Sequence, residues 1–218
     1  MKKWIKLVDS TTPIDLVIAN AGVTETTANV AMDVEASART VFDINVTGVW
    51  NTIFPALDGM RERQKGQIAI VSSLAGFGPL SGSAAYAASK AAVKTYAESL
   101  RWQMKREGVR VNIITPGYVS TPLTAANKFS QPGMVSVQYA VKRIISGLSY
   151  DEPIIAFPTS TYVGAWLVGT IPPVIKDFIS RNRLIGTIAY WKSKKGGNSS
   201  SSTSSSTAPT STGSRKTK

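Results

Sequence analysis

Tyr86 and Lys90 are the two residues whose types and spacing point most directly to chemistry. They stand four residues apart in a segment expected to be helical, so their side chains share one helix face. A cation beside a phenol favours the phenolate and lowers the tyrosine pKa from about 10 toward working pH, which makes the pair a general acid and base. The sequence contains no histidine and no cysteine, which excludes imidazole and thiolate chemistry.

The tyrosine–lysine spacing alone is weak support for an active site. Tyr190 and Lys194 have the same spacing at the edge of a low-complexity tail. Ser73 precedes the first pair by thirteen residues, at the end of an expected strand, whereas Asp177 stands at that offset before the second pair. A cationic stripe along the helix that carries Tyr86 also leaves open a solvated helix face. Its members are Lys90, Lys94, Arg101 and Lys105.

Short apolar runs alternate along the chain with segments of helical periodicity. The runs are typical of buried parallel strands and cover 14–19, 67–72, 109–114 and 154–157. The helical segments cover 36–64, 84–107 and 136–148. We expect Ser83 to cap the second helical segment and Gly108 to end it. Strands that alternate with helices predict an α/β fold with a parallel sheet.

Residues typical of binding sites follow three of these strands. Asn20-Ala21-Gly22 follows the first strand, Ser73 the second and Pro116-Gly117 the third. Asn45 lies within the first helical segment. Because ligand sites in open α/β sheets lie outside the carboxyl ends of the strands, we expect these residues to converge on one site.

Five motifs occur together in the chain: Ala19-Asn20-Ala21-Gly22, Ile44-Asn45-Val46-Thr47-Gly48, Ile70-Val71-Ser72-Ser73-Leu74-Ala75-Gly76, Tyr86-Ala87-Ala88-Ser89-Lys90 and Val111-Asn112-Ile113-Ile114-Thr115-Pro116-Gly117 with Thr121. In order and spacing they closely resemble the short-chain dehydrogenase/reductase family over residues 8–158. The resemblance implies a Rossmann-like, doubly wound parallel sheet. It also implies an oxidoreductase that transfers a hydride between NAD or NADP and a carbonyl or alcohol.

The resemblance also implies roles for individual residues. Tyr86 would exchange a proton with the substrate oxygen, and Lys90 would lower its pKa and hold the ribose of the nicotinamide. Ser73 would hydrogen-bond the carbonyl oxygen, and Asn45 would hold a water in a proton relay. The cofactor would further contact Asn20, Ala21, Gly22, Pro116, Gly117, Val119 and Thr121. The helices at 36–64 and 84–107 would form the contact of a homodimer or homotetramer in the full-length family form.

Several of these assignments have a structural alternative. Ser72 could face the site instead of Ser73, and Asn20 could only brace neighbouring strands. Asn45 could simply kink its helix, and Thr121 could cap a following helix. We interpret Asn112 as structural.

The sequence departs from the family at its N-terminus. The family places a glycine-rich TGxxxGIG turn, which holds the cofactor pyrophosphate, some seventy to eighty residues before the Asn-Ala-Gly turn. Here nineteen residues precede Asn20, and none is glycine. We therefore expect an incomplete sheet whose first strands are missing and in which 14–19 becomes an edge. A truncated gene model or splice product is favoured over a real but non-catalytic product, scaffold or membrane-associated protein with the same fold.

The net charge of +12 is unevenly distributed. Residues 192–218 form a Ser/Thr-rich basic tail without acids, which predicts disorder after a domain at 1–191. This placement argues against nucleic acid as the main partner. Residues 153–175 carry no charge, and we expect a buried strand and a helix there, with contact to a membrane surface left open. We predict a cytoplasmic protein without a metal site.

In the family, substrate preference comes from the segment that follows the Pro-Gly turn, and from later residues. Apolar side chains there suggest a lipid-like carbonyl or alcohol, although the same residues would serve as ordinary core. These side chains are Phe129, Met134, Tyr162 and Trp166.

Overall fold

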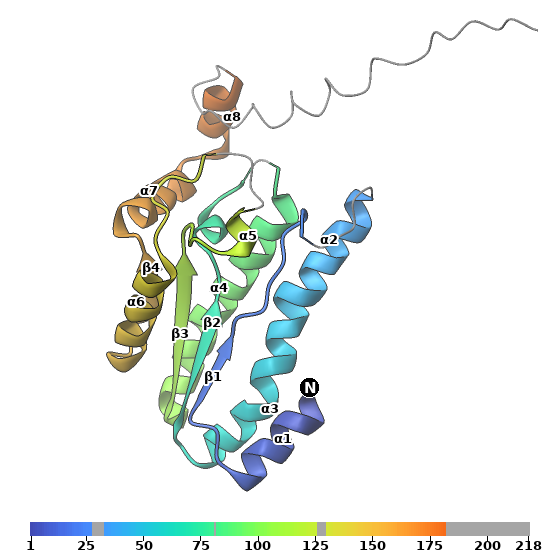
Figure 1. Cartoon of the computed structure of the whole chain (residues 1–218), viewed down its shortest axis with the longest axis vertical. Helices are drawn as coiled ribbons and strands as arrows, with labels where there is room; N and C mark the ends of the chain where they lie inside the picture. Colours follow the sequence, from blue (N-terminus) through green and yellow to red (C-terminus); the bar gives the residue numbers. More distant parts are fainter. Residues whose placement is uncertain (28–32, 81, 126–129, 182–218) are drawn as a thin grey trace, which may run out of the picture.

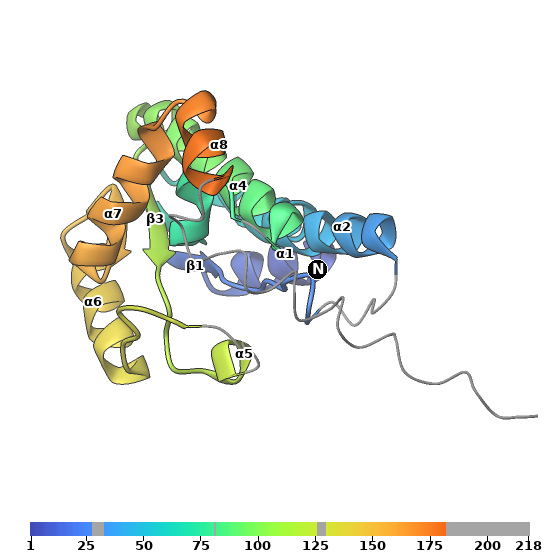
Figure 2. The same ribbon diagram turned by 90° about the horizontal axis from the view of Figure 1, so that it is seen from above.

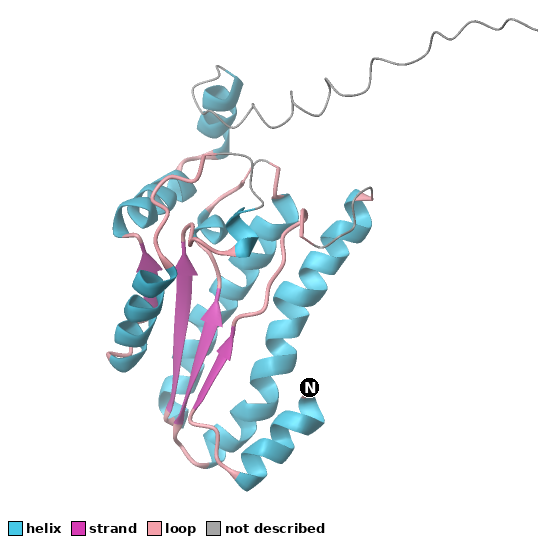
Figure 3. Ribbon diagram, in the orientation of Figure 1, coloured by secondary structure: helices cyan, strands magenta, loops and turns pink. Residues whose placement is uncertain are grey.

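The computed structural model describes residues 1–27, 33–80, 82–125 and 130–181. Within these residues, four parallel strands form one sheet in the order β1-β2-β3-β4 (Figure 3). The strands are β1 (Leu16–Ala19), β2 (Gly66–Val71), β3 (Val109–Pro116) and β4 (Ile154–Phe157). Helices connect them, so the predicted α/β, Rossmann-like fold is confirmed.

The helices cover both faces of the sheet, as the views in Figures 1 and 2 show. They are α1 (Lys2–Thr11), α2 (Val34–Phe42), α3 (Gly48–Glu62), α4 (Ala84–Met104), α5 (Pro122–Ala125), α6 (Val137–Ser149), α7 (Thr159–Thr170) and α8 (Pro173–Arg181). Ile68 and Ile70 of β2 pack with α3 and α4, whereas Ala69 packs in a second cluster with α6 and β4. This two-sided burial explains why the central strands are continuous apolar runs.

The helical segment predicted at 36–64 is wrong in detail. It is two α-helices joined by a π-helical turn over Asp43–Thr47. The second predicted helix ends close to its expected bound, where Gly108 adopts a φ of 71°. A Cβ at Gly108 would lie 2.2 Å from the carbonyl oxygen of Gln64, so glycine is required there.

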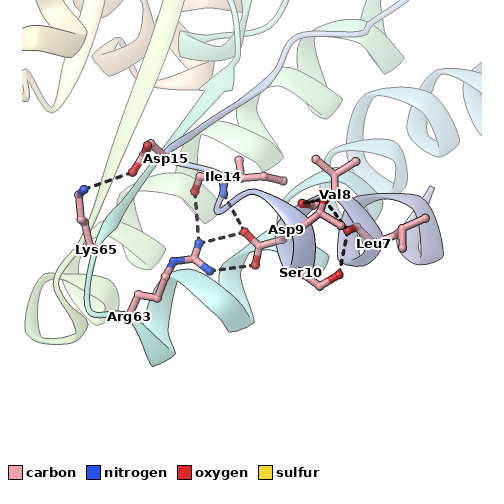
Figure 4. Close-up of polar contacts among 9 residues, drawn as sticks. Leu7, Val8, Asp9, Ser10, Ile14, Asp15, Arg63 and Lys65 are labelled. Atoms are coloured by element: carbon pink, nitrogen blue, oxygen red, sulfur yellow. Dashed lines mark hydrogen bonds and ion pairs between the residues drawn. The ribbon is translucent and has the colours of Figure 1, made fainter.

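The N-terminal helix α1 was not predicted, because it buries little apolar surface. Ile5 is its one buried residue. Asp9 anchors the helix instead: its carboxylate accepts hydrogen bonds from the Arg63 guanidinium, at 2.9 and 3.1 Å, and from the backbone N–H of Ile14 (Figure 4). The Arg63 hydrogen bonds hold the pKa of the Asp9 carboxyl below its usual value. This contact fixes the turn from α1 into β1.

Strand β1 lies at the edge of the described sheet, as the sequence predicts. Leu16 and Ile18 are 41% and 44% exposed, because their side chains lie on the face of β1 that no described helix covers. Val17 and Ala19 face the core cluster beneath α3.

The uncharged stretch 153–175 is divided between β4, α7 and the start of α8. The expected strand and helix are therefore confirmed. Among the described helices, none has the length and apolar character needed to cross a bilayer. Phe129, the alternative pair Tyr190 and Lys194, and the tail at 192–218 lie outside the described residues.

Candidate active site

The carboxyl end of β2 and the first turns of α4 bring the predicted site residues together. Ser73 follows β2, and its hydroxyl hydrogen-bonds the phenol of Tyr86, which is mostly buried. The Ser73 hydroxyl also donates a long hydrogen bond to the carbonyl oxygen of Pro116, at 3.4 Å. Three segments far apart in the sequence thus meet at one hydroxyl.

Ser72 faces away from this phenol. Its buried hydroxyl donates to the backbone carbonyl of Lys90 at 2.7 Å and so ties β2 to α4. The 3-10 turn that follows β2, Leu74–Phe77, also approaches α4 closely, because Gly76 has no side chain; a Cβ there would lie 2.9 Å from the Lys90 carbonyl. The geometry therefore favours Ser73 over Ser72 as the residue that faces the site.

The Lys90 side chain is 3% exposed and turned toward the sheet. Its amine donates to the carbonyl oxygen of Val71 at 2.9 Å and lies 5.8 Å from the centre of the Tyr86 ring. Burial lowers the pKa of Lys90 to about 8. The alternative of a solvated helix face is wrong for Lys90.

The expected lowering of the Tyr86 pKa by Lys90 is not found in this structure. Burial raises the Tyr86 pKa above 10.0, and the hydrogen bond from Ser73 only partly opposes that rise. Tyr118 and Glu25 raise it further. The physical reason is that the Lys90 amine bonds a backbone carbonyl and is itself desolvated, so it does not neutralise a phenolate here.

Lys90→Met should raise stability at neutral pH. A lysine whose folded pKa is lowered from 10.5 to about 8 opposes folding fully below about pH 8, and this penalty fades as pH rises toward 10.5. The penalty is about 3 kcal/mol of unfolding free energy. The substitution also removes the hydrogen bond to the Val71 carbonyl, which costs about 1 kcal/mol. We expect a gain of about 2 kcal/mol at pH 7, measured by urea unfolding.

The gain from Lys90→Met should disappear at pH 10.5. Lys94→Met is the matched control, because the Lys94 amine lies on the same helix and pairs with Glu98 at 3.0 Å. A Lys90→Met protein that is less stable than wild type at pH 7 would contradict a desolvated ammonium.

Asn45 is fully buried in the π-helical turn and connects three segments. Its amide oxygen accepts from the backbone N–H of Val23 at 2.8 Å. Its amide nitrogen donates to the Val23 carbonyl at 2.9 Å and to the Ser89 hydroxyl at 3.0 Å. Ser89 in turn donates to the Tyr86 carbonyl at 2.8 Å. Asn45 thus joins the turn after β1 to the helix that carries Tyr86; its relay role stays a prediction.

The turn after β1 approaches Lys90 and Asn45 closely at Gly22, which we call the Gly22 cradle. A Cβ on Gly22 would lie 3.1 Å from the Lys90 amine and 3.2 Å from the Asn45 amide oxygen. Asn20 and Ala21 are exposed next to it. This glycine cradle fits the ribose end of a nicotinamide cofactor, whereas the nineteen residues before Asn20 contain no glycine that could form a pyrophosphate turn.

The Pro116-Gly117 turn lies at the end of β3, and Gly117 donates its N–H to the Phe157 carbonyl at 2.7 Å. Val119 forms an isolated bridge with Val135. Thr121 immediately precedes α5, and its carbonyl accepts the N–H of Ala125 at 2.9 Å. Thr121 therefore occupies the cap position that the sequence left open, while its contact with a cofactor stays a prediction.

Two of the residues predicted to select substrate line a cavity. A cavity of about 350 Å³ between α4 and α7 is lined by Tyr162 and Trp166, together with Phe77, Lys94 and Glu98. Met134 is exposed. Asn112, interpreted as structural, is buried and donates to Asp151 and to the Glu152 carbonyl.

Glu25 is a further candidate site residue, which no sequence motif indicates. Its carboxylate accepts the backbone N–H of Tyr86 at 3.0 Å and so caps the first turn of α4. Ser83, the expected cap, occupies the N-cap position without a side-chain hydrogen bond. The second Glu25 oxygen is buried and has no hydrogen-bond partner. Glu25 thus places a negative charge beside the candidate acid.

Glu25→Gln should lower the pKa of the Tyr86 phenol. The amide oxygen can still accept the Tyr86 N–H, whereas the charge that raises the phenol pKa is removed. NMR titration of tyrosines labelled at Cζ measures the change, with Tyr86→Phe to assign the signal. Glu98→Gln is the control, since Glu98 pairs with Lys94. An unchanged or raised Tyr86 pKa would refute the role of Glu25.

Comparisons with known proteins agree with the geometry. A family model described as short chain dehydrogenase matches residues 2–131. An uncharacterized oxidoreductase of Myxococcus xanthus is 40% identical over 168 residues, which is 77% of this chain and 66% of that protein. An acetoacetyl-CoA reductase of Synechocystis is 35% identical over 121 residues, 56% of this chain and 50% of that protein. The chain spans less than two thirds of the length of these curated relatives.

Solved structures share the fold. A short chain dehydrogenase from Burkholderia cenocepacia in complex with NADP superposes with a TM-score of 0.67 at 24% identity, covering 83% of this chain and 76% of that one. An oxidoreductase from Burkholderia thailandensis gives a TM-score of 0.61 at 28% identity, covering 71% of this chain and 66% of that one.

Proposed function

The chain belongs to the short-chain dehydrogenase/reductase family, and from this premise we propose that the complete protein interconverts a carbonyl and an alcohol with NAD or NADP. One observation carries the proposal: the partly buried Tyr86 phenol is hydrogen-bonded to the Ser73 hydroxyl beside the Lys90 amine. The Burkholderia cenocepacia relative in complex with NADP supports the cofactor. The Synechocystis acetoacetyl-CoA reductase supports a carbonyl substrate.

The chain's own residues supply position and a proton. Ser73 orients the substrate oxygen through its hydroxyl, and Tyr86 donates its proton to that oxygen during reduction. Because burial raises the Tyr86 pKa, the phenol is protonated at neutral pH, which suits reduction. When bound, the cofactor supplies the hydride.

Lys90 and the Gly22 cradle hold the ribose end of the cofactor in this proposal. A larger residue at position 22 would crowd the amine, because a Cβ there would lie 3.1 Å from it. A ribose hydroxyl there would give the amine a second partner besides the Val71 carbonyl. Asn45 holds the cradle in place through Val23.

The complete protein is proposed to associate through α3 and α4 as a homodimer or a homotetramer. Trp50 and Phe54 of α3 are exposed although both stack edge-on against Tyr96 of α4. Exposed aromatic side chains on adjacent helices are typical of a contact between subunits. A cytoplasmic location stays a prediction.

The test is nicotinamide-dependent turnover by the 218-residue chain and by a longer form that carries the in-frame sequence preceding Met1. We expect the longer form to oxidise NAD(P)H with a panel of apolar ketones, aldehydes and β-ketoacyl thioesters. The 218-residue chain should bind the cofactor far more weakly, because it has no glycine before Asn20. A longer form that binds NAD(P)H but reduces no carbonyl would overturn the proposal.

A further inference from the structure

Helices α7 and α8 carry seven exposed apolar side chains, called here the α7–α8 surface. Each side chain is between 45% and 80% exposed. They are Val163, Trp166, Leu167, Val168, Val174, Ile175 and Phe178. The two helices lie beyond the carboxyl ends of the strands, at one end of the molecule (Figure 1). Seven exposed apolar side chains on two consecutive helices indicate a binding face.

The α7–α8 surface is exposed because the opposite side of α7 makes the contacts with the domain. Tyr162 packs edge-on against Phe77, with ring centres 5.4 Å apart. A Cβ on Gly169 would lie 2.2 Å from the Phe77 carbonyl oxygen, so glycine lets α7 approach closely. Lys176 of α8 donates to the Gly169 carbonyl at 3.2 Å and fastens α8 to the end of α7. Val163 and Leu167 therefore lie away from this contact, whereas Trp166 lies on the same face as Tyr162 and is half exposed where it lines the cavity beside α4.

Helix α8 carries its exposed apolar side chains on one face, as a helix that lies on a membrane surface does. Val174, Ile175 and Phe178 are spaced so that they share one helix face. All three are exposed, and Phe178, which has the largest side chain of the three, is 66% exposed. A helix with an outward apolar face flanked by charges is typical of interfacial contact with a membrane.

The sequence from residue 153 onward is strongly positive. From residue 153 onward the sequence contains one acid, Asp177, and nine cations. The cations are Lys176, Arg181, Arg183, Lys192, Lys194, Lys195, Arg215, Lys216 and Lys218. Basic residues beside an apolar interfacial helix attract anionic headgroups. The same charge repels a second copy of this chain, which would bring like charges together across the contact.

We propose that the α7–α8 surface docks onto an anionic lipid bilayer. The apolar side chains of both helices enter the boundary between headgroups and acyl chains, and the cations around and after α8 contact the headgroups. Neither helix crosses the bilayer, since α7 has 12 residues and α8 has 9. The docking places the carboxyl ends of the strands, where the candidate active site lies, on the membrane side of the molecule (Figures 1 and 2).

The test is sedimentation of the 218-residue chain with phosphatidylcholine vesicles, with and without phosphatidylserine. We expect binding to the vesicles that contain phosphatidylserine, and release at high salt. The double substitution Ile175→Ser/Phe178→Ser should lower partition into these vesicles about tenfold or more. The matched control is Leu7→Ser/Trp102→Ser, which removes two side chains that are 63% and 80% exposed on α1 and α4. Circular dichroism checks that each variant keeps the wild-type fold.

Any one of the following results would overturn the proposal. If the α8 variant partitions as the wild type does, or if phosphatidylserine makes no difference, the surface does not dock on anionic lipid. If instead the α8 variant changes the oligomeric state in size-exclusion chromatography without changing partition, the occupant is a second copy of the chain. Loss of partition in the α8 variant, with the control unchanged, supports the proposal.

Discussion

Tyr86→Phe is expected to lower kcat/KM for carbonyl reduction about 10³-fold in the longer form described above. The substitution keeps the ring and removes only the hydroxyl that Ser73 bonds. The other hydrogen bonds of the Ser73 hydroxyl are to backbone groups, the Pro116 carbonyl and the Ala75 N–H, so Tyr86 is the described side chain beside Ser73 that can donate a proton. The measurement is steady-state reduction, followed by NAD(P)H absorbance.

The pH dependence of the two directions gives a second readout of the same phenol. Because burial raises the Tyr86 pKa, reduction should be independent of pH around neutrality and fall only in the alkaline range, where the phenol ionises. Oxidation needs the phenolate and should rise with pH across the same range. Bound cofactor and substrate will shift this range, but the two directions keep opposite slopes.

Tyr96→Phe is the control for Tyr86→Phe, since Tyr96 lies on the same helix and packs against Trp50 and Phe54. It should leave kcat/KM unchanged. If Tyr86→Phe retains activity within about tenfold of wild type, another group delivers the proton, because general acid catalysis contributes more than that. Glu25, next to the Tyr86 backbone, would then be the first residue to test.

The sheet could be predicted from sequence because burial on both faces leaves a direct signal. Ile68 and Ile70 contact one layer of helices and Ala69 the other, so β2 is an unbroken apolar run. The edge position of β1 also follows from the sequence, since no strand-like run precedes residue 14. Helix α1 leaves no such signal, because it is held mainly through Asp9 rather than through an apolar face.

The site was predictable as a set of motifs but not in its electrostatics. Spacing along α4 places Tyr86 and Lys90 on one helix face, yet it does not say which partner the amine bonds. The Val71 carbonyl lies on β2 and accepts a hydrogen bond from the amine. Glu25 could not be found either, because it caps a helix 61 residues further along the chain. Local sequence patterns do not predict which charged side chains tertiary contacts bring close to the site.

Asn45→Ala should lower the free energy of unfolding by about 3 kcal/mol, because it leaves buried polar groups without partners. The backbone N–H and carbonyl of Val23 both lose their bond, and the Ser89 hydroxyl loses its donor. Urea unfolding at pH 7 measures the loss. Asn45→Asp should cost nearly as much, since an oxygen would then face the Val23 carbonyl.

The control is Asn51→Ala, which removes an exposed amide on α3, and it should change stability by less than about 0.5 kcal/mol. A loss of less than about 1 kcal/mol for Asn45→Ala would mean that water replaces the amide, and that Asn45 does not fix the turn after β1. A full loss would show that this amide sets the position of Gly22 beside Lys90. In that case the same network that stabilises the π-helical turn also shapes the cofactor cradle, so stability and cofactor affinity should fall together in the longer form.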